Sequence, residues 1–127
     1  MMGRSEIDRL IREFYAARVR GDLEAVCRSF SADAQFKIAS ASKVRPVAIS
    51  ANGVEEIRPL MALLFKTFRL SDFAILAMTI DGAEVTVHWQ ANVRSKITGA
   101  TVPTELADIV KLRDGFIADF DEVYARS

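Results

Sequence analysis

The sequence predicts a soluble α+β domain in which three amphipathic helices pack against one curved antiparallel sheet. Apolar residues recur with helical spacing through the first half and alternate with strand spacing in the second half. Two Asp-Gly pairs, Asp81-Gly82 and Asp114-Gly115, are typical of tight hairpins. Hairpins in succession join antiparallel neighbours, whereas a βαβ fold would place helices between the strands. We therefore expect a curved meander that encloses a small, mostly apolar pocket.

The composition is that of one globular domain covering residues 1–127. Half of the residues are hydrophobic, and 17 basic residues balance 17 acidic ones, which predicts no nucleic-acid or anionic-membrane partner. The apolar stretches are too short to span a bilayer and the N-terminus lacks a signal core, so we expect a cytoplasmic protein. Cys27 and His88 are each the only residue of their kind, which excludes an internal disulfide and a structural zinc site. We expect neither a metal nor another cofactor.

The first two helices are predicted from caps and apolar spacing. Ser5 can cap the first helix, Gly21 can end it, and Asp22 can cap the second. The apolar positions follow the spacing i, i+3, i+4, i+7, namely Ile7, Leu10, Ile11 and Phe14, then Leu23, Val26, Cys27 and Phe30.

The third helix is predicted to begin at Asn52, with Glu55 three residues later as a variant capping box. Pro59 lies about two turns in, where it should remove a backbone hydrogen bond and kink or delay the helix. Residues 37–51 favour short strands at the rim of the sheet. The residues that favour strands there are Val44, Val47 and Ile49, around Pro46. The helix carries an apolar stripe of Val54, Ile57, Leu60, Met61, Leu64, Phe65 and Phe68.

The strands follow. Phe73 to Ile80 is mostly apolar in both alternating sets of positions, which predicts a strand buried on both faces. Residues 83–97 alternate cleanly but exceed the usual strand length of roughly 3 to 10 residues, so we expect a bend or bulge. After a turn near Thr98-Gly99, strands over residues 104–113 and 116–124 complete the sheet. In the long strand, Val85, Val87, Trp89, Ala91 and Val93 share one face, opposite Glu84, Thr86, His88, Gln90, Asn92 and Arg94.

Asp108 is the residue that most strongly indicates chemistry. It shares strand parity with Leu106, Val110 and Leu112, so its carboxyl should lie on the inward, apolar face. A buried carboxylate is costly unless it is paired, so we expect hydrogen bonds or a raised pKa. Such a group can exchange a proton near neutral pH, which makes Asp108 the candidate catalytic residue. The alternative is a structural aspartate bound to a backbone amide or a tyrosine, and a bulge would instead expose it.

Other polar residues are less decisive. Glu122 shares the parity of Phe116 and Phe120, and it either faces the interior or forms the solvated end of the last strand; we favour the solvated end. His88 lies with Gln90 on the polar face of its strand, which favours a surface or subunit contact over acid–base chemistry. The predicted pocket-lining residues are Phe14, Tyr15, Ile38, Phe65, Trp89, Phe120 and Tyr124. Large aromatic residues on a buried face are also common core residues.

Four segments resemble the SnoaL-like and ketosteroid isomerase-like branch of the NTF2-like superfamily. They are Gly21 to Ala25, Phe30 to Ala34, Gly53 to Arg58 and Asp108 to Ile117, in this order and at these spacings. The resemblance implies an NTF2-like cone, with a deep pocket and a homodimer formed through the outer face of the sheet. It does not imply one function, because the superfamily contains isomerases, cyclases, dehydratases, hydrolases and non-catalytic modules.

Ketosteroid isomerase uses an aspartate base, with a tyrosine and a protonated aspartic acid that bind the oxyanion. Matching without gaps from Gly21, the tyrosine position falls on Phe14 and the base position falls on Ile38, neither of which can perform the role. Asp108 alone corresponds, to the oxyanion acid. The resemblance therefore argues against a ketosteroid isomerase.

Two functions remain open from the sequence. The first is an isomerase, cyclase or lyase that uses Asp108 as acid–base on a small hydrophobic carbonyl compound. The second is a non-catalytic ligand-binding or dimerisation module, which the residues Phe14 and Ile38 favour.

Overall fold

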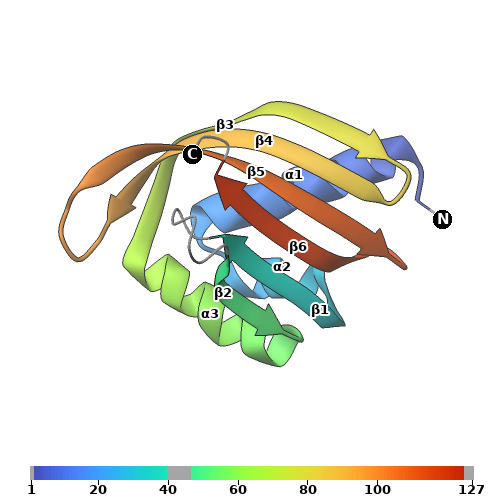
Figure 1. Cartoon of the computed structure of the whole chain (residues 1–127), viewed down its shortest axis with the longest axis horizontal. Coiled ribbons are helices and arrows are strands. Elements are labelled where there is room, and N and C mark those ends of the chain that lie inside the picture. The colour runs from blue at the N-terminus through green and yellow to red at the C-terminus, as the bar shows by residue number, and fades with distance from the viewer. Residues whose placement is uncertain (1, 40–46, 125–127) are drawn as a thin grey trace.

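The computed structural model describes residues 2–39 and 47–124, and it has the predicted α+β architecture (Figure 1). Val44 and Pro46 of the predicted rim lie outside the described residues. The elements are α1 (Arg4–Arg20), α2 (Leu23–Arg28), β1 (Phe30–Ala39), β2 (Val47–Asn52), α3 (Val54–Thr67), β3 (Phe68–Asp81), β4 (Glu84–Ser95), β5 (Thr101–Arg113) and β6 (Phe116–Tyr124). None of the helices in this part of the chain is both long and apolar enough to cross a membrane.

The strands form one curved, unclosed sheet in the order β2-β1-β6-β5-β4-β3. The meander from β3 to β6 is antiparallel as predicted, whereas β1 pairs with β6 in parallel. The core lies between the helices and one face of the sheet. It contains Ile11 and Phe14 from α1, Ile57 from α3, and Val87 and Val110 from the sheet, all fully buried.

The helix boundaries confirm some predicted caps and correct others. Gly21 ends α1 in the left-handed conformation with φ of 73°, and the Asp22 side chain accepts a hydrogen bond from the Ala25 N–H at 3.1 Å, as predicted. Ser5 is not the first cap, because α1 already begins at Arg4. Pro59 does not delay α3, which begins directly after Gly53 and continues through the proline.

β3 differs from its prediction. It lies at the edge of the sheet and is not buried on both faces, because none of the side chains from Phe73 to Ile80 is fully buried and Leu76 is 45% exposed. The irregularity expected in the long strand lies in this neighbour instead. Asp72 and Phe73 together lie opposite Ala91, with Asp72 in the left-handed region at φ of 52°. The bulge directs Phe73 toward the interior, which matters for the site below.

The last hairpin also contains a bulge. Asp114 and Gly115 both have positive φ, as an Asp-Gly hairpin turn requires. Lys111 pairs with Asp119, but the next residue of β5 pairs with Ile117, so Ala118 is an extra residue in β6. The extra residue reverses the alternation. Phe116, which shares sequence parity with Phe120, is therefore exposed, while Ile117 and Phe120 are buried.

Candidate functional site

Asp108 lies in the core, as its strand parity predicted. It is 0% exposed on the inner face of β5, between Leu106 and Val110. Its Oδ2 accepts hydrogen bonds from the Tyr15 hydroxyl and, at 2.7 Å, from the Trp89 Nε1–H. Its Oδ1 is buried and has no hydrogen-bond partner among the described residues. The two donors therefore occupy one oxygen and leave the other unpaired.

Each partner is positioned by its own element. Tyr15 lies one turn after Ile11 on the buried face of α1. In the β4–β5 register, the Trp89–Leu106 pair is adjacent to the Val87–Asp108 pair on the inner face. The alternation of side chains in both strands thus places the indole beside the carboxyl.

A second buried pair lies next to Asp108. The Arg18 guanidinium binds the Glu122 carboxylate with two hydrogen bonds, Nη1–Oε2 at 2.6 Å and Nη2–Oε1 at 3.0 Å. The two side chains are only 9% and 5% exposed. Glu122 is the direct cross-strand neighbour of Asp108. The prediction that Glu122 forms the solvated end of β6 is wrong, because Arg18 supplies a charge partner inside the fold.

Arg18 is the residue that the sequence interpretation missed. Its guanidinium carbon lies 5.4 Å from the centre of a Trp89 ring, so the same side chain contacts Glu122 and the tryptophan that donates to Asp108. A signal was present in the sequence. Ile7, Ile11, Phe14 and Arg18 follow the spacing of one helix face, which places a charge on an apolar stripe.

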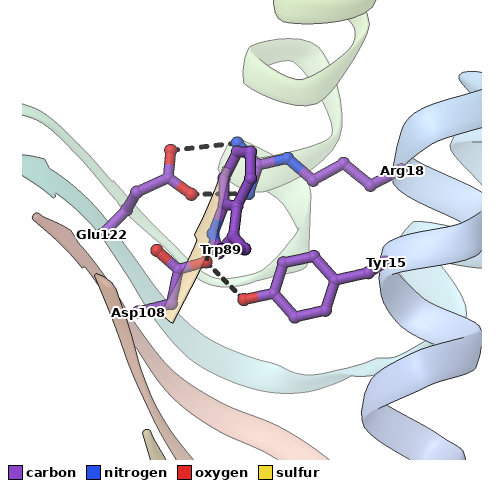
Figure 2. Close-up of polar contacts among 5 residues, drawn as sticks. All are labelled: Tyr15, Arg18, Trp89, Asp108 and Glu122. Atoms are coloured by element: carbon purple, nitrogen blue, oxygen red, sulfur yellow. Dashed lines mark hydrogen bonds and ion pairs between the residues drawn. The ribbon is translucent and has the colours of Figure 1, made fainter. Parts of the chain in front are cut away.

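These five residues form the Asp108 cluster: Tyr15, Arg18, Trp89, Asp108 and Glu122. Figure 2 shows Tyr15 and Arg18 extending from α1 toward the two carboxyl groups on the sheet. Burial raises the pKa of Asp108 well above its usual range, and repulsion by Glu122 adds to this effect, while Arg18 and the two donors oppose it. Burial, followed by the charge of Asp108, also raises the pKa of the Tyr15 hydroxyl.

The pKa of Arg18 responds differently to burial. Burial, the largest single effect, would lower its pKa, but the charge of Glu122 and the hydrogen bonds to it, with smaller contributions from Asp108 and Tyr15, together raise the pKa, so the guanidinium stays charged. The raised pKa of Asp108 favours its neutral, protonated form. Because Oδ2 already accepts two hydrogen bonds, the proton of a neutral Asp108 belongs on Oδ1.

Asp108→Asn should flatten the pH dependence of stability. An unfolded aspartate has a pKa of about 3.9, whereas Asp108 with its raised pKa keeps its proton to higher pH in the folded chain. Between these two pKa values the folded state binds more protons, so rising pH destabilises the wild type by up to about 1.4 kcal/mol per pH unit. Chemical denaturation from pH 4 to 8 measures the difference. Parallel curves for the two proteins would show that Asp108 is ionised in the fold.

The other predicted site residues have different positions. Phe14, Tyr15, Trp89 and Phe120 are fully buried, and Phe14 lies 5.5 Å from Phe120 between ring centres. Ile38 and Phe65 are half-buried, and the side chain of Tyr124 lies outside the described residues. A pocket lined by these seven residues therefore stays a prediction. His88 lies on the outer face with its Nε2 3.1 Å from the Glu105 carboxylate, in accord with the predicted surface position.

A groove of about 600 Å³ lies over β3, β4 and β5, and its lining includes Asp72, Ala91, Val102, Thr104 and Glu105. A second groove, of about 650 Å³, lies between the start of α1 and the two hairpin turns. Asp108 lines neither of them. The lining of the first groove takes in both faces of the sheet, with Ala91 and Thr104 on the inner face and Gln90 and Glu105 on the outer face. On the inner face, the pair Trp89–Leu106 lies between the pair Ala91–Thr104 and the row of Asp108.

No group of three or more potential metal ligands occurs within residues 2–39 and 47–124. The Asp108 cluster consists of two acids, one arginine and two aromatic donors. This set can hold or move a proton and can donate hydrogen bonds to a developing negative charge.

The open, curved sheet with helices on its inner face defines an NTF2-like protein. Residues 11–120 match the model of the SnoaL-like domain, and the chain belongs to this family. No curated protein matches the sequence.

Solved structures agree on the fold. A proposed isomerase from Bacillus subtilis has a TM-score of 0.84 at 18% identity, with 98% of this chain and 89% of that chain covered. An LEH-like epoxide hydrolase from M. tuberculosis has a TM-score of 0.77 at 16% identity, with 94% and 83% covered. A protein from Catenulispora acidiphila with a ketosteroid isomerase-like fold, in complex with trimethylamine, has a TM-score of 0.76 at 17% identity, with 93% and 86% covered. Identities this low show the fold alone.

The ungapped match with ketosteroid isomerase places the tyrosine position on Phe14. In the structure the next residue, Tyr15, donates its hydroxyl to Asp108, so a tyrosine is paired with the buried acid beside that position. Position 38 is an isoleucine, which cannot act as a base.

Proposed function

We propose that this protein is a SnoaL-like enzyme that acts on a small hydrophobic carbonyl compound, as an isomerase, cyclase or lyase, with Asp108 as the acid. One observation carries the proposal. Asp108 is a fully buried acid whose Oδ2 receives two hydrogen bonds while its Oδ1 receives none. A buried polar atom without a partner costs stability, so its retention is better explained by a role in function than by a role in folding.

The geometry suggests how the acid works. Tyr15 and Trp89 hold Oδ2, so the proton of the neutral acid lies on Oδ1 and is free to be donated. A carbonyl oxygen placed at Oδ1 would accept this hydrogen bond, which would stabilise negative charge on that oxygen in the transition state. In a site that excludes water such a bond is stronger than in solution, and proton transfer by a positioned acid contributes roughly 10²- to 10⁴-fold.

The first groove offers a route to the acid. Its volume of about 600 Å³ falls within the range of roughly 300–1,000 Å³ that is typical of small-molecule sites. Phe73 stacks on Tyr15 with ring centres 5.6 Å apart and lies 5.5 Å from Trp89, so it covers the Asp108 cluster from β3. In this proposal, a substrate enters at the pair Ala91–Thr104 and displaces the half-buried Phe73 ring.

Ligand binding tests the proposal. A panel of planar phenols, enolisable ketones and apolar carboxylates should contain compounds that stabilise the wild type, with a gain of roughly 2.7 kcal/mol at 100 times the dissociation constant. Thr104→Phe fills the groove and should abolish the thermal shift. The matched control is Thr86→Phe, whose exposed side chain lies on the outer face of β4 and should leave the shift unchanged.

Asp108→Asn should still bind the panel's ligands, because the amide keeps the shape of the carboxylic acid, so that a loss of turnover in this variant can be assigned to the missing proton. Ligands that bind equally to the wild type and to both phenylalanine variants would place binding outside the groove. Such a result would show that the first groove is not the route to Asp108.

A non-catalytic ligand-binding or dimerisation module is the second candidate. The observation in its favour is that Tyr15, Trp89 and Arg18 already satisfy most polar atoms of the Asp108 cluster, as a purely structural network would. A homodimer through the outer sheet face, where Ala107 and Ile109 lie half-buried, belongs to this proposal. Self-association in sedimentation experiments, together with no ligand from the panel, would favour the module over the enzyme.

A further inference from the structure

One end of the molecule carries exposed apolar side chains. Leu63, Phe68, Ile97 and Val102 are all exposed, Ile97 at 79% and Val102 at 58%. The sheet register holds them together, because Phe68 pairs with Ser95 and Val102 pairs with Val93. In Figure 1 the hairpin between β4 and β5 projects at the left, beside the end of α3. The Lys96 N–H anchors this hairpin to the Thr67 carbonyl at 2.8 Å.

The same end concentrates positive charge in Lys66, Arg69, Arg94 and Lys96. Arg69 and Arg94 lie directly opposite one another across β3 and β4, a placement that destabilises a sheet through repulsion. Neither arginine pairs with a carboxylate among residues 2–39 and 47–124. The one acid beside them, Asp72, accepts a hydrogen bond from the Asn92 side chain at 2.9 Å. We call these four cations and the four apolar residues the hairpin rim.

The whole chain is electrically balanced, and for that reason the sequence predicted no anionic-membrane partner. The structure, however, gathers at one end cations that pair with no carboxylate among the described residues. At this end Arg69 and Arg94 lie on the outer face of the sheet, and Phe68 and Val102 lie on the opposite face. A second copy of this chain would not cover the rim by a two-fold contact, because its own four cations would face these four. The occupant must instead be anionic and must accept apolar side chains.

We propose that the hairpin rim binds the surface of a membrane that contains anionic lipids. Ile97, at the projecting tip, and Val102 insert among the headgroups, while Arg69 and Arg94 contact the lipid phosphates from the flank. A projecting tip suits a flat surface, whereas an acidic protein partner would need a matching hollow. Basic residues near an anionic leaflet each add to binding, and buried apolar side chains add the remainder.

Sedimentation with vesicles tests this proposal. The full chain should bind vesicles of phosphatidylcholine mixed with phosphatidylglycerol and should not bind phosphatidylcholine alone. The double variant Arg69→Gln/Arg94→Gln should weaken binding to the vesicles by about 30-fold. Added salt should also weaken the binding of the wild type, because it screens the charges. Ile97→Ser should also weaken binding. The matched control is Arg9→Gln/Arg28→Gln, which removes the same charge from exposed positions on α1 and α2 and should change binding little.

Three results would overturn the proposal. They are no binding to the mixed vesicles, equal loss in both double variants, and binding to soluble polyglutamate without binding to vesicles. The last result would assign the rim to an acidic protein. Circular dichroism of each variant confirms that the fold is retained, since all of the substituted residues are exposed.

Discussion

Replacing Arg18 with methionine should lower the free energy of unfolding by about 3–5 kcal/mol. Methionine keeps most of the apolar volume of the arginine stem but removes the guanidinium that binds both oxygens of Glu122. Glu122 is then left as an uncompensated charge in the core, with Asp108 directly opposite. The decrease in the free energy of unfolding should therefore be far larger than the decrease caused by breaking a surface ion pair. Urea denaturation at neutral pH measures it.

The control is Arg12→Met, which breaks the exposed pair with Asp8 on the same helix and should cost no more than about 0.5 kcal/mol. The double variant Arg18→Met/Glu122→Met should recover most of the lost stability, because it removes both charges together. If Arg18→Met costs no more than the control, the ion pair does not form in the folded protein.

Asp108→Asn should reduce turnover by roughly 100- to 10,000-fold on a substrate drawn from the ligand panel. The amide can still accept hydrogen bonds from Tyr15 and Trp89, so the fold and ligand binding should persist while proton donation from Oδ1 is lost. The effect should appear in kcat more than in KM, because the acid acts in the transition state. Tyr15→Phe should give a smaller loss, since it removes one support of the acid and leaves its proton.

The control carboxylate is Asp121, which pairs with Ile109 on the outer face of β6, and Asp121→Asn should keep full turnover. Full turnover in Asp108→Asn as well would show that the acid is structural. The Asp108 cluster would then act as a buried polar network that positions α1 on the sheet.

Much of the fold was predictable because it depends on local sequence. The Asp-Gly pairs specify hairpins through the positive φ that the turn requires, and strict alternation from Val85 to Ala91 specifies which side chains of β4 face the core. The same parity argument placed Asp108 inside. Each of these signals compares residues within a single strand or turn, so the partners of that element need not be known.

The parts that were missed depend on which elements meet. The bulge at Ala118 reverses the alternation in β6, and it is visible only in the pairing of β6 with β5. Arg18 and Glu122 each interrupt an apolar pattern, and either one alone indicates a solvated end. They become a stable pair only when α1 packs across β6, far away along the chain.

By itself, the sequence determined the α+β class, the antiparallel meander and the inward position of Asp108, because helical and strand periodicity are properties of single elements. Only the tertiary structure decided that Tyr15 rather than Phe14 reaches that acid, that Arg18 neutralises Glu122, and that cations collect at the hairpin rim. These features depend on distances between segments far apart in the chain, and those distances are set by the packing of α1 and α3 against the sheet.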